Sequence, residues 1–209
     1  VVQGFRWGVR EGPLCEEPVR GVTFRVIGAA LAAEEAQRSG VQLIPTARRV
    51  CYSALLTAVP RLLEPVLRVE VQTPHACVAI VHTLVSRRRG QVVDERRCAG
   101  TPLGTVLVLL PAIEAYGFET EVRTHTQGQA FCQQVFDHWE LVPGDPCDRT
   151  IVLRPLEPAP TAHLAREFMV KTRRRKGLSD DVAPEKFFDD ELRALYDRES
   201  LASGRPLPL

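Results

Sequence analysis

Residues 61–146 alternate between two hydrophobic periods, and this alternation restricts the fold more than any other feature of the sequence. At positions 63–71 apolar and polar residues alternate, which predicts a half-buried strand. In the next segment apolar residues recur three or four positions apart, which predicts a helix with one buried face. These helix residues are Cys77, Ile80, Val81, Leu84 and Val85. We predict that Thr73 caps this helix, Pro74 opens it and Gly90 lies just beyond its end.

Four further segments complete the pattern. Gln91–Arg97 is a more polar strand that we place at a sheet edge, and residues 105–110 form a continuous apolar run expected of a central strand. Pro111 opens a short helix, which is interrupted near Gly117. The last strand alternates apolar with polar positions and ends at the sequence PGDP; its apolar residues are Phe131, Val135, Trp139 and Leu141. The order strand, helix, strand, strand, helix, strand predicts an α+β domain of the ferredoxin-like split β-α-β type.

The segments before position 61 are less complete. The chain opens with the helix-like VVQGFRWGVR, and we predict a strand at 22–30, a loop at 31–43 and a helix at 45–59. Pro60 ends that helix, because proline cannot continue its hydrogen bonds. We predict that its inward residues are Val50, Ala54, Leu55 and Ala58. One strand and two helices do not enclose a core, and Val1 is not methionine, so we expect a longer protein cut within a second α/β domain.

The segments after Pro146 consist of a linker, a helix and a tail. A proline-rich link, RPLEPAPTAH, leads into a helix predicted at 161–176, whose apolar stripe is Leu164, Ala165, Phe168 and Met169. The acidic tail that follows contains a second short amphipathic pattern, formed by Phe188, Leu192, Leu195 and Tyr196. We expect the final SGRPLPL to be disordered.

The composition disfavours several classes of function. The net charge of +1 gives no bulk attraction for nucleic acid, so such binding would need local clusters. No apolar run reaches the roughly 18 residues of a membrane span. The six cysteines show no CxxC pair and no Cys/His spacing, which predicts no metal site and a reducing intracellular compartment. Without a GxxxxGK[ST] motif or a recognisable catalytic constellation, we expect no catalytic residue, no bound cofactor and no enzymatic activity in this segment.

Two basic runs are candidates for contacts with partners. The first closes the predicted helix before Gly90 and consists of Arg87, Arg88 and Arg89. These residues would bind RNA phosphates or would only cap the helix, where the dipole favours cations. The second run is the densest positive patch and consists of Lys171, Arg173, Arg174, Arg175 and Lys176. It would be a nuclear import signal, a salt-dependent contact with RNA or an acidic protein, or a solvated helix end.

The loop at 34–40 is the most specific candidate for a partner contact outside the basic runs. It is long and polar and lies between a predicted strand and a predicted helix, as recognition loops commonly do. Its candidate contact residues are Gln37, Arg38, Ser39 and Gly40. The alternative is a surface loop that tolerates substitution.

A ferredoxin-like unit also raises the hypothesis of an RNA-recognition module, which stacks bases on aromatic residues of its central strands. The predicted central strands, at 63–71 and 105–110, contain no aromatic residue. We expect Phe131 and Trp139 to share the face that forms the core, so we reject this hypothesis.

Several motifs resemble the elongation factor 2 family of large GTPases. GFRWGVREGPLCEEPVRGVTFRV and GVQLIPTARRV resemble its domain IV, and LEPVLRVEVQTP through YGFET, QGQAF and DHWELVPGDP resembles its domain V. The resemblance implies a ribosomal S5 domain 2-like part at 1–60 and a ferredoxin-like domain V at 61–148. It also implies a linker and helix at 149–177 that pack back on domain IV, and a partly disordered acidic tail at 178–209.

Two features select a branch of that family. IVLRPLEPAPTAHLAREFMVKTRRRKGLSDD, followed by FFDD, resembles the GTPase branch of the spliceosomal U5 small nuclear ribonucleoprotein. The translation factors of the family have a modified histidine in the tip loop of domain IV, where this chain has Gln37. Glutamine has no imidazole to accept that modification, which disfavours a role at the ribosomal decoding site.

The resemblance implies a nuclear module of a GTP-binding parent protein. Such a module couples the GTP state to spliceosome activation and disassembly in pre-mRNA splicing, while GTP and magnesium occupy the absent G domain. The implied partners are the large U5 scaffold protein, the U5 particle with its helicase, and U5 small nuclear RNA as a further candidate, without a membrane or a small-molecule substrate. The alternatives are the C-terminal domains of an elongation factor 2-type ribosomal translocase and a free-standing interaction domain.

Overall fold

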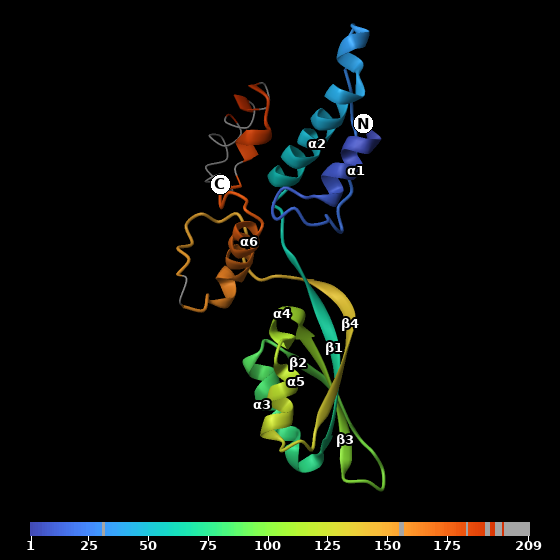
Figure 1. Ribbon diagram of the computed structural model, residues 1–209, viewed down its shortest axis with the longest axis vertical. Coiled ribbons are helices and arrows are strands. Elements are labelled where there is room, and N and C mark those ends of the chain that lie inside the picture. Colours follow the sequence, from blue (N-terminus) through green and yellow to red (C-terminus); the bar gives the residue numbers. More distant parts are fainter. Residues whose placement is uncertain (31, 155–156, 183, 191–192, 195–197, 199–209) are drawn as a thin grey trace. The chain divides into compact units, whose positions relative to one another are not determined.

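The computed structural model divides the chain into two compact units (Figure 1). Unit 1 comprises Val1–Leu62 and Pro143–Leu209, and unit 2 comprises Leu63–Val142. The structure describes residues 1–30, 32–154, 157–182, 184–190, 193–194 and 198. No helix in these ranges has both the length and the apolar content needed to cross a membrane.

Unit 2 is built on one antiparallel sheet of four strands in the order β2-β3-β1-β4. The strands are β1 (Leu63–Pro74), β2 (Gln91–Arg97), β3 (Leu103–Pro111) and β4 (Phe131–Leu141). The predicted α+β class is therefore confirmed, with β2 at an edge and β3 in the centre, because continuous apolar runs suit strands with neighbours on both sides.

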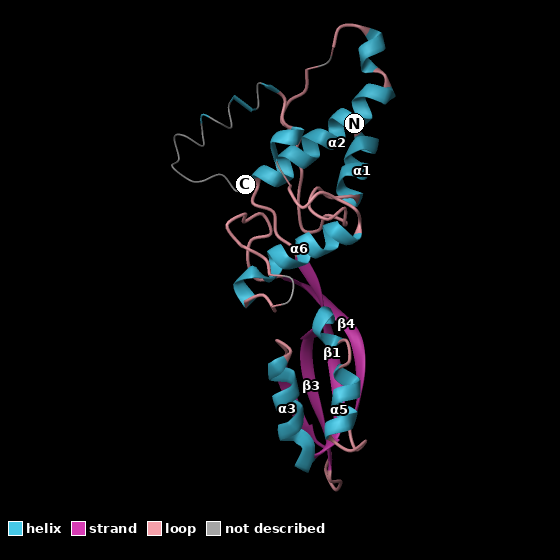
Figure 2. Cartoon of the chain, turned by 60° about the vertical axis from the view of Figure 1, so that its left-hand side comes forward, coloured by secondary structure: helices cyan, strands magenta, loops and turns pink. Residues whose placement is uncertain are grey.

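Helices cover one face of this sheet (Figure 2). They are η2 (His75–Cys77), α3 (Val78–Arg87), α4 (Ala112–Ala115) and α5 (Phe118–His125). The apolar stripe predicted for α3 is confirmed: Val81, Leu84 and Val85 are buried against Val108 of β3 and Phe118 of α5 in one core. Each buried side chain of this size contributes about 1.5–3 kcal/mol.

The ends of α3 differ from the prediction. β1 continues through Pro74, and α3 has no side-chain cap, so Thr73 is not its N-cap. At the other end Arg89, not Gly90, adopts the left-handed conformation, with φ +54°. Glycine is required at position 90 for a different reason, because there is no room for a side chain: a Cβ added here would lie 2.7 Å from a methyl carbon of Val85.

A bulge in β4 reverses the faces on which its side chains lie. Asp137 has no partner on β1, because the register shifts at this point. Phe131 lies opposite Gln72, whereas Trp139 lies opposite Pro65. Gln72 and Pro65 are an odd number of positions apart, so they and their partners point to opposite faces. The prediction that Phe131 and Trp139 share a core face is wrong, and both side chains are exposed.

Unit 1 consists of helices and long connections. Its elements are α1 (Val2–Arg10), η1 (Glu35–Arg38), α2 (Gly40–Thr57), η3 (Thr161–His163), α6 (Leu164–Arg175) and η4 (Pro184–Phe187). The helix-like opening of the chain is confirmed as α1, which packs on α2. Gly4 permits their close approach, since a Cβ there would lie 2.4 Å from the backbone oxygen of Ile44.

Three predictions for the first part of unit 1 are wrong. Residues 22–30 form no strand, because no described segment pairs with them. The predicted loop at 31–43 contains η1, and α2 begins at Gly40 with Pro45 inside it. The inward residues of α2 are Tyr52, Ser53 and Leu56; Val50, Ala54 and Ala58 are exposed and Leu55 is half-buried.

The second part of unit 1 agrees better with the sequence. Helix η3 and α6 cover nearly all of the predicted segment at 161–176, with Leu164, Ala165 and Met169 buried and Phe168 half-buried. Met169 lies in a core with Leu14, Leu56 and Val182, so three distant segments meet there. Phe188 is buried, while Leu192, Leu195, Tyr196 and the final SGRPLPL lie outside the described residues.

Candidate partner-binding surfaces

The predicted recognition loop is built around η1 and the start of α2. The backbone oxygen of Ser39 accepts hydrogen bonds from the N–H groups of Gln42 and Leu43, at 3.1 and 3.0 Å, and so starts α2. Arg38 donates from Nη2 to the backbone oxygen of Ala33 at 3.3 Å. Residues 38–40 are exposed, and Gln37 lies within η1, although its side chain is not described. The loop therefore presents one locally held cation rather than a basic patch.

Within the first basic run, Arg88 connects α3 to the α4–α5 segment. Its guanidinium donates to the backbone oxygens of Glu114 and Tyr116 at 2.5 and 2.7 Å, and to the Glu121 carboxylate at 3.1 Å. This hydrogen bond lowers the pKa of Glu121. Arg88 therefore satisfies carbonyl groups at the end of α4, where no intrahelical partner remains.

Arg89 is committed to a different internal contact. Two of its nitrogens donate to the two carboxylate oxygens of Glu64 on β1, each at 2.9 Å. The Glu64 side chain is only 10% exposed, and its hydrogen bonds raise the pKa of Arg89. Arg87, by contrast, is exposed and is the member of the run that faces solvent.

The second basic run contains a buried guanidinium at Arg173. The side chain donates to the backbone oxygens of Pro13 and Leu14, and to that of Ser179 at 2.5 Å. It is 8% exposed, so these carbonyls replace the water that the cation loses. Arg173 thus joins α6 to a segment near the beginning of the chain.

The other members of this run also have partners, with one exception. Lys176 donates to the backbone oxygen of Cys15 at 2.7 Å and forms an ion pair with Glu17. Arg174 pairs with Asp180, which raises the pKa of Arg174 and lowers that of Asp180, and Lys171 pairs with Glu167 one turn earlier. Within the described part of the chain, Arg175 is exposed and makes no such pair.

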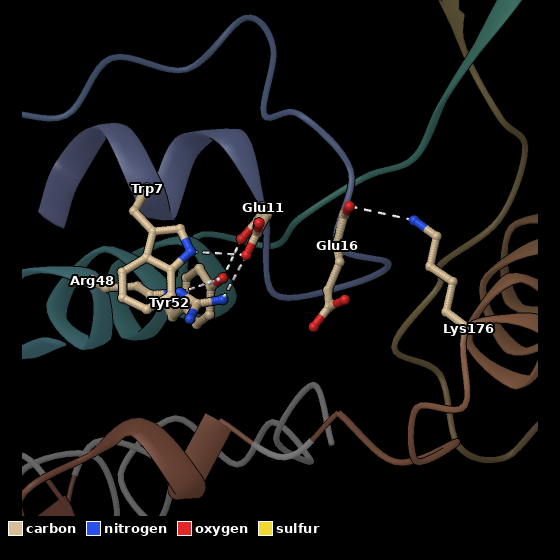
Figure 3. A network of polar contacts seen from close by, with 6 residues as sticks. All are labelled: Trp7, Glu11, Glu16, Arg48, Tyr52 and Lys176. Atoms are coloured by element: carbon tan, nitrogen blue, oxygen red, sulfur yellow. Dashed lines mark hydrogen bonds and ion pairs between the residues drawn. The ribbon is translucent and has the colours of Figure 1, made fainter. Parts of the chain in front are cut away.

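A polar network that sequence reasoning missed joins α1 to α2 (Figure 3). The Arg48 guanidinium lies 4.0 Å from the centre of the Trp7 ring and donates to the Tyr52 hydroxyl at 2.9 Å. Glu11 accepts from Trp7 Nε1 at 2.9 Å and from Arg48 at 3.2 Å. The signal in the sequence is the spacing of four residues within each helix, between Trp7 and Glu11 and between Arg48 and Tyr52.

Among the described residues, no group of three or more His, Cys, Asp or Glu side chains is arranged to hold a metal ion. Burial raises the pKa values of the Cys15 and Cys147 thiols to about 11, so both stay protonated at neutral pH. A protonated thiol is a poor nucleophile. The arrangement as a whole is that of a framework held by internal ion pairs, with a few exposed groups.

Comparison with known proteins assigns two consecutive segments within the first 150 residues. Residues 1–59 match elongation factor G, domain IV, and residues 61–150 match the elongation factor G C-terminus. Over 192 residues the chain is 61% identical to the 110 kDa U5 small nuclear ribonucleoprotein component CLO of Arabidopsis thaliana, and 61% identical to the 109 kDa component GFL of the same plant. It is 55% identical to the pre-mRNA-splicing factor cwf10 of Schizosaccharomyces pombe.

Each of these alignments includes 92% of the chain and 20% of the relative, so the chain spans about a fifth of the length of the curated relatives it matches. The two family matches are consecutive and together span most of the chain. Its sheet has the strand order expected of the ferredoxin-like C-terminal domain. The chain therefore belongs to the elongation factor G family, with domain IV sequence at residues 1–59 and C-terminal sequence at residues 61–150.

Proposed function

We propose that this chain is the C-terminal module of a GTP-binding component of the spliceosomal U5 small nuclear ribonucleoprotein, acting in the nucleus in pre-mRNA splicing. The observation that carries this proposal is the 61% identity to U5 components, which extends over 92% of the chain and so includes both units. Gln37, at the position where the translation factors have a modified histidine, supports the same branch over the ribosomal one.

The module binds protein and RNA neighbours and couples the GTP state of its parent to activation and disassembly of the spliceosome. We place GTP and magnesium in the G domain of the parent and assign no nucleotide to this segment. The partners are the large U5 scaffold protein, the helicase of the particle and U5 small nuclear RNA. Coupling requires elements that move as units, and the internal bonds of Arg88, Arg89 and Arg173 support such stiffness.

The exposed groups restrict where RNA or an acidic protein would bind. Arg38 lies in the loop at 34–40, Arg87 ends α3 and Arg175 ends α6, and all three are exposed. The other cations of the two basic runs already have internal partners. We therefore propose Arg38, Arg87 and Arg175 as the contact residues of the module and the remaining cations as its framework.

The first test is to purify the tagged full-length parent from its own cells and to sequence the RNA that copurifies. We expect enrichment of U5 small nuclear RNA. Enrichment of ribosomal RNA would overturn the spliceosomal assignment in favour of a ribosomal translocase. Recovery of neither RNA, with a stable protein partner instead, would overturn the assignment to a ribonucleoprotein.

The second test addresses the contact residues in the same parent protein. Replacing Arg38 or Arg175 with glutamate should weaken retention of the parent in the particle as salt is raised, because each change reverses one exposed charge. The matched control is Arg6→Glu, which reverses an exposed charge on α1 that we assign to no contact. Equal losses for all three variants would contradict the assignment of Arg38 and Arg175.

A further inference from the structure

The two edges of the sheet in unit 2 differ in the protection of their backbone groups. β4 pairs with β1 on its inner side, and no described strand pairs with its outer side. An unpaired edge presents a row of N–H and C=O groups that match an extended chain, so proteins normally protect such edges with charges, lysine or proline. β2 follows this rule, since its last four residues are the charged sequence DERR.

β4 follows this rule only near its end, where it has the bulge at Asp137 and a second carboxylate at Glu140. Its sequence, FCQQVFDHWEL, contains no lysine, arginine or proline. Five large apolar side chains along the strand are each between 41% and 60% exposed: Phe131, Val135, Phe136, Trp139 and Leu141. Val135 lies opposite Arg68 and Phe131 opposite Gln72, so these two share the face that no helix covers. Phe136, opposite Leu67, precedes the bulge, and Trp139, opposite Pro65, follows it, so both side chains lie on the other face of the sheet, with their rings 5.8 Å apart.

The charges on β4 restrict the chemistry of a partner. Asp137 and Glu140 are exposed, and they are the only acidic or basic residues of the strand apart from His138, which pairs with Asp137. Two carboxylates repel RNA phosphates and also repel the same strand of a second copy. They attract lysine or arginine, and the exposed aromatic and aliphatic residues bind apolar side chains.

We propose that the outer edge of β4 binds an extended basic peptide segment of a protein partner, which adds to the sheet as a fifth strand. Backbone hydrogen bonds to the edge supply the pairing, apolar side chains at alternate positions contact Val135 or Phe136, and basic residues approach Asp137 and Glu140. This surface depends on the exposed edge alone and not on the splicing assignment.

The test uses the whole chain and a fluorescently labelled peptide, KVTVKVTVK, which has alternating β-branched and basic residues. Fluorescence anisotropy should show saturable binding, and amide hydrogen exchange should slow in β4 but not in β2. The acidic peptide EVTVEVTVE should bind about tenfold more weakly, because it meets like charges. Protection of β2 instead, or absence of saturable binding, would overturn the proposal.

Matched variants locate the site. Val135→Lys adds a cation to the exposed edge and should weaken binding of KVTVKVTVK about tenfold. Val93→Lys makes the same change at an exposed position of β2 and should leave binding unchanged. Equal losses for both variants would overturn the assignment to β4. The same would follow if single-stranded RNA competed for the edge, or if sedimentation showed a dimer that Val135→Lys dissociates without peptide.

Discussion

Each unit of this chain has an arginine in internal contacts, half-buried Arg89 in unit 2 and buried Arg173 in unit 1, and the two have different kinds of partner. In unit 2, Arg89 meets the carboxylate of Glu64, a side chain of opposite charge. In unit 1, Arg173 meets only backbone oxygens, those of Pro13, Leu14 and Ser179. The difference follows from the architecture around them, because a sheet satisfies its own backbone and long connections do not.

Unit 2 is one continuous segment in which strand ladders pair the backbone of β1, so Arg89 beside this strand binds a carboxylate, while Arg88 supplies hydrogen bonds only where the backbone leaves the ladder, at the end of α4. Unit 1 combines the two ends of the chain, and none of its described residues forms a strand. Its connections near positions 13 and 179 therefore depend on a side chain for hydrogen bonds. Removal of each arginine should expose this difference, and each unit has its own tryptophan as a reporter, Trp7 or Trp139.

The largest effect is expected for Arg89→Met, which leaves the Glu64 carboxylate buried without its cation. Breaking a buried ion pair on one side destabilises by about 3 kcal/mol. Urea unfolding followed by Trp139 fluorescence in a Trp7→Phe background measures the loss in unit 2. Arg87→Met, which changes an exposed residue at the end of α3, is the control and should change stability by less than about 0.5 kcal/mol. Equal effects of both changes would contradict a special role for the Glu64 contact.

A slightly smaller effect is expected for Arg173→Met in unit 1. The change leaves neutral carbonyls rather than a charge without partners, which costs about 2.5 kcal/mol. Trp7 fluorescence in a Trp139→Phe background reports on this unit. Arg175→Met is the matched control, because Arg175 is exposed on the same helix. If Arg173→Met leaves the unfolding transition reported by Trp7 unchanged, then the hydrogen bonds of Arg173 to the backbone carbonyls do not stabilise the packing of α6.

The contrast between the units also explains which features could be predicted from the sequence. In unit 2 the periods of β1, β3 and α3 are local, and each period specifies one buried face. The bulge at Asp137 has no such signature, so the prediction for the faces of Phe131 and Trp139 is wrong. The position of a bulge depends on the neighbouring strand, which no window of the sequence contains.

Unit 1 is harder to predict because its determinants lie far apart in the sequence. The apolar residues at 22–30 favour a strand locally, but a strand requires a partner and no described segment provides one. The basic runs are visible in the sequence as charge, whereas their internal partners, such as Glu64 for Arg89 and Pro13 for Arg173, depend on tertiary contacts. Among the predicted contact residues, Arg38, Arg87 and Arg175 are exposed cations that no described ion pair engages.

A third effect, about 2 kcal/mol, is expected for Gly144→Ala in unit 1. Gly144 has φ +100°, and a Cβ there would lie 2.1 Å from the backbone oxygen of Ala162. Gly177→Ala is the control within the same unit, because Gly177 also has positive φ, but a Cβ added there would meet no atom within 4 Å. The control should cost about 1 kcal/mol, measured by Trp7 fluorescence. A larger loss in Gly177→Ala would show that backbone strain, rather than space, dominates at these turns.

A fourth effect depends on pH and is measured in unit 1. Burial raises the pKa values of Cys15 and Cys147 in unit 1 to about 11, from 9.0. Between these values the unfolded thiols lose their protons while the folded thiols keep theirs, so stability falls as pH rises from 9 to 11. The expected loss is on the order of 1 kcal/mol per pH unit for each thiol.

The double variant Cys15→Ala and Cys147→Ala removes these two thiols and should reduce the dependence of the Trp7 transition on pH, while Cys51 and Tyr52, whose pKa values burial also raises, keep part of it. Cys98→Ala, which changes an exposed thiol of unit 2, should leave that slope intact. Because lysine and tyrosine side chains also titrate in this range, the decisive quantity is the difference in slope between the double variant and the parent chain. Parallel slopes would mean that the two thiols gain access to water in folded unit 1, and that its core is looser than that of unit 2.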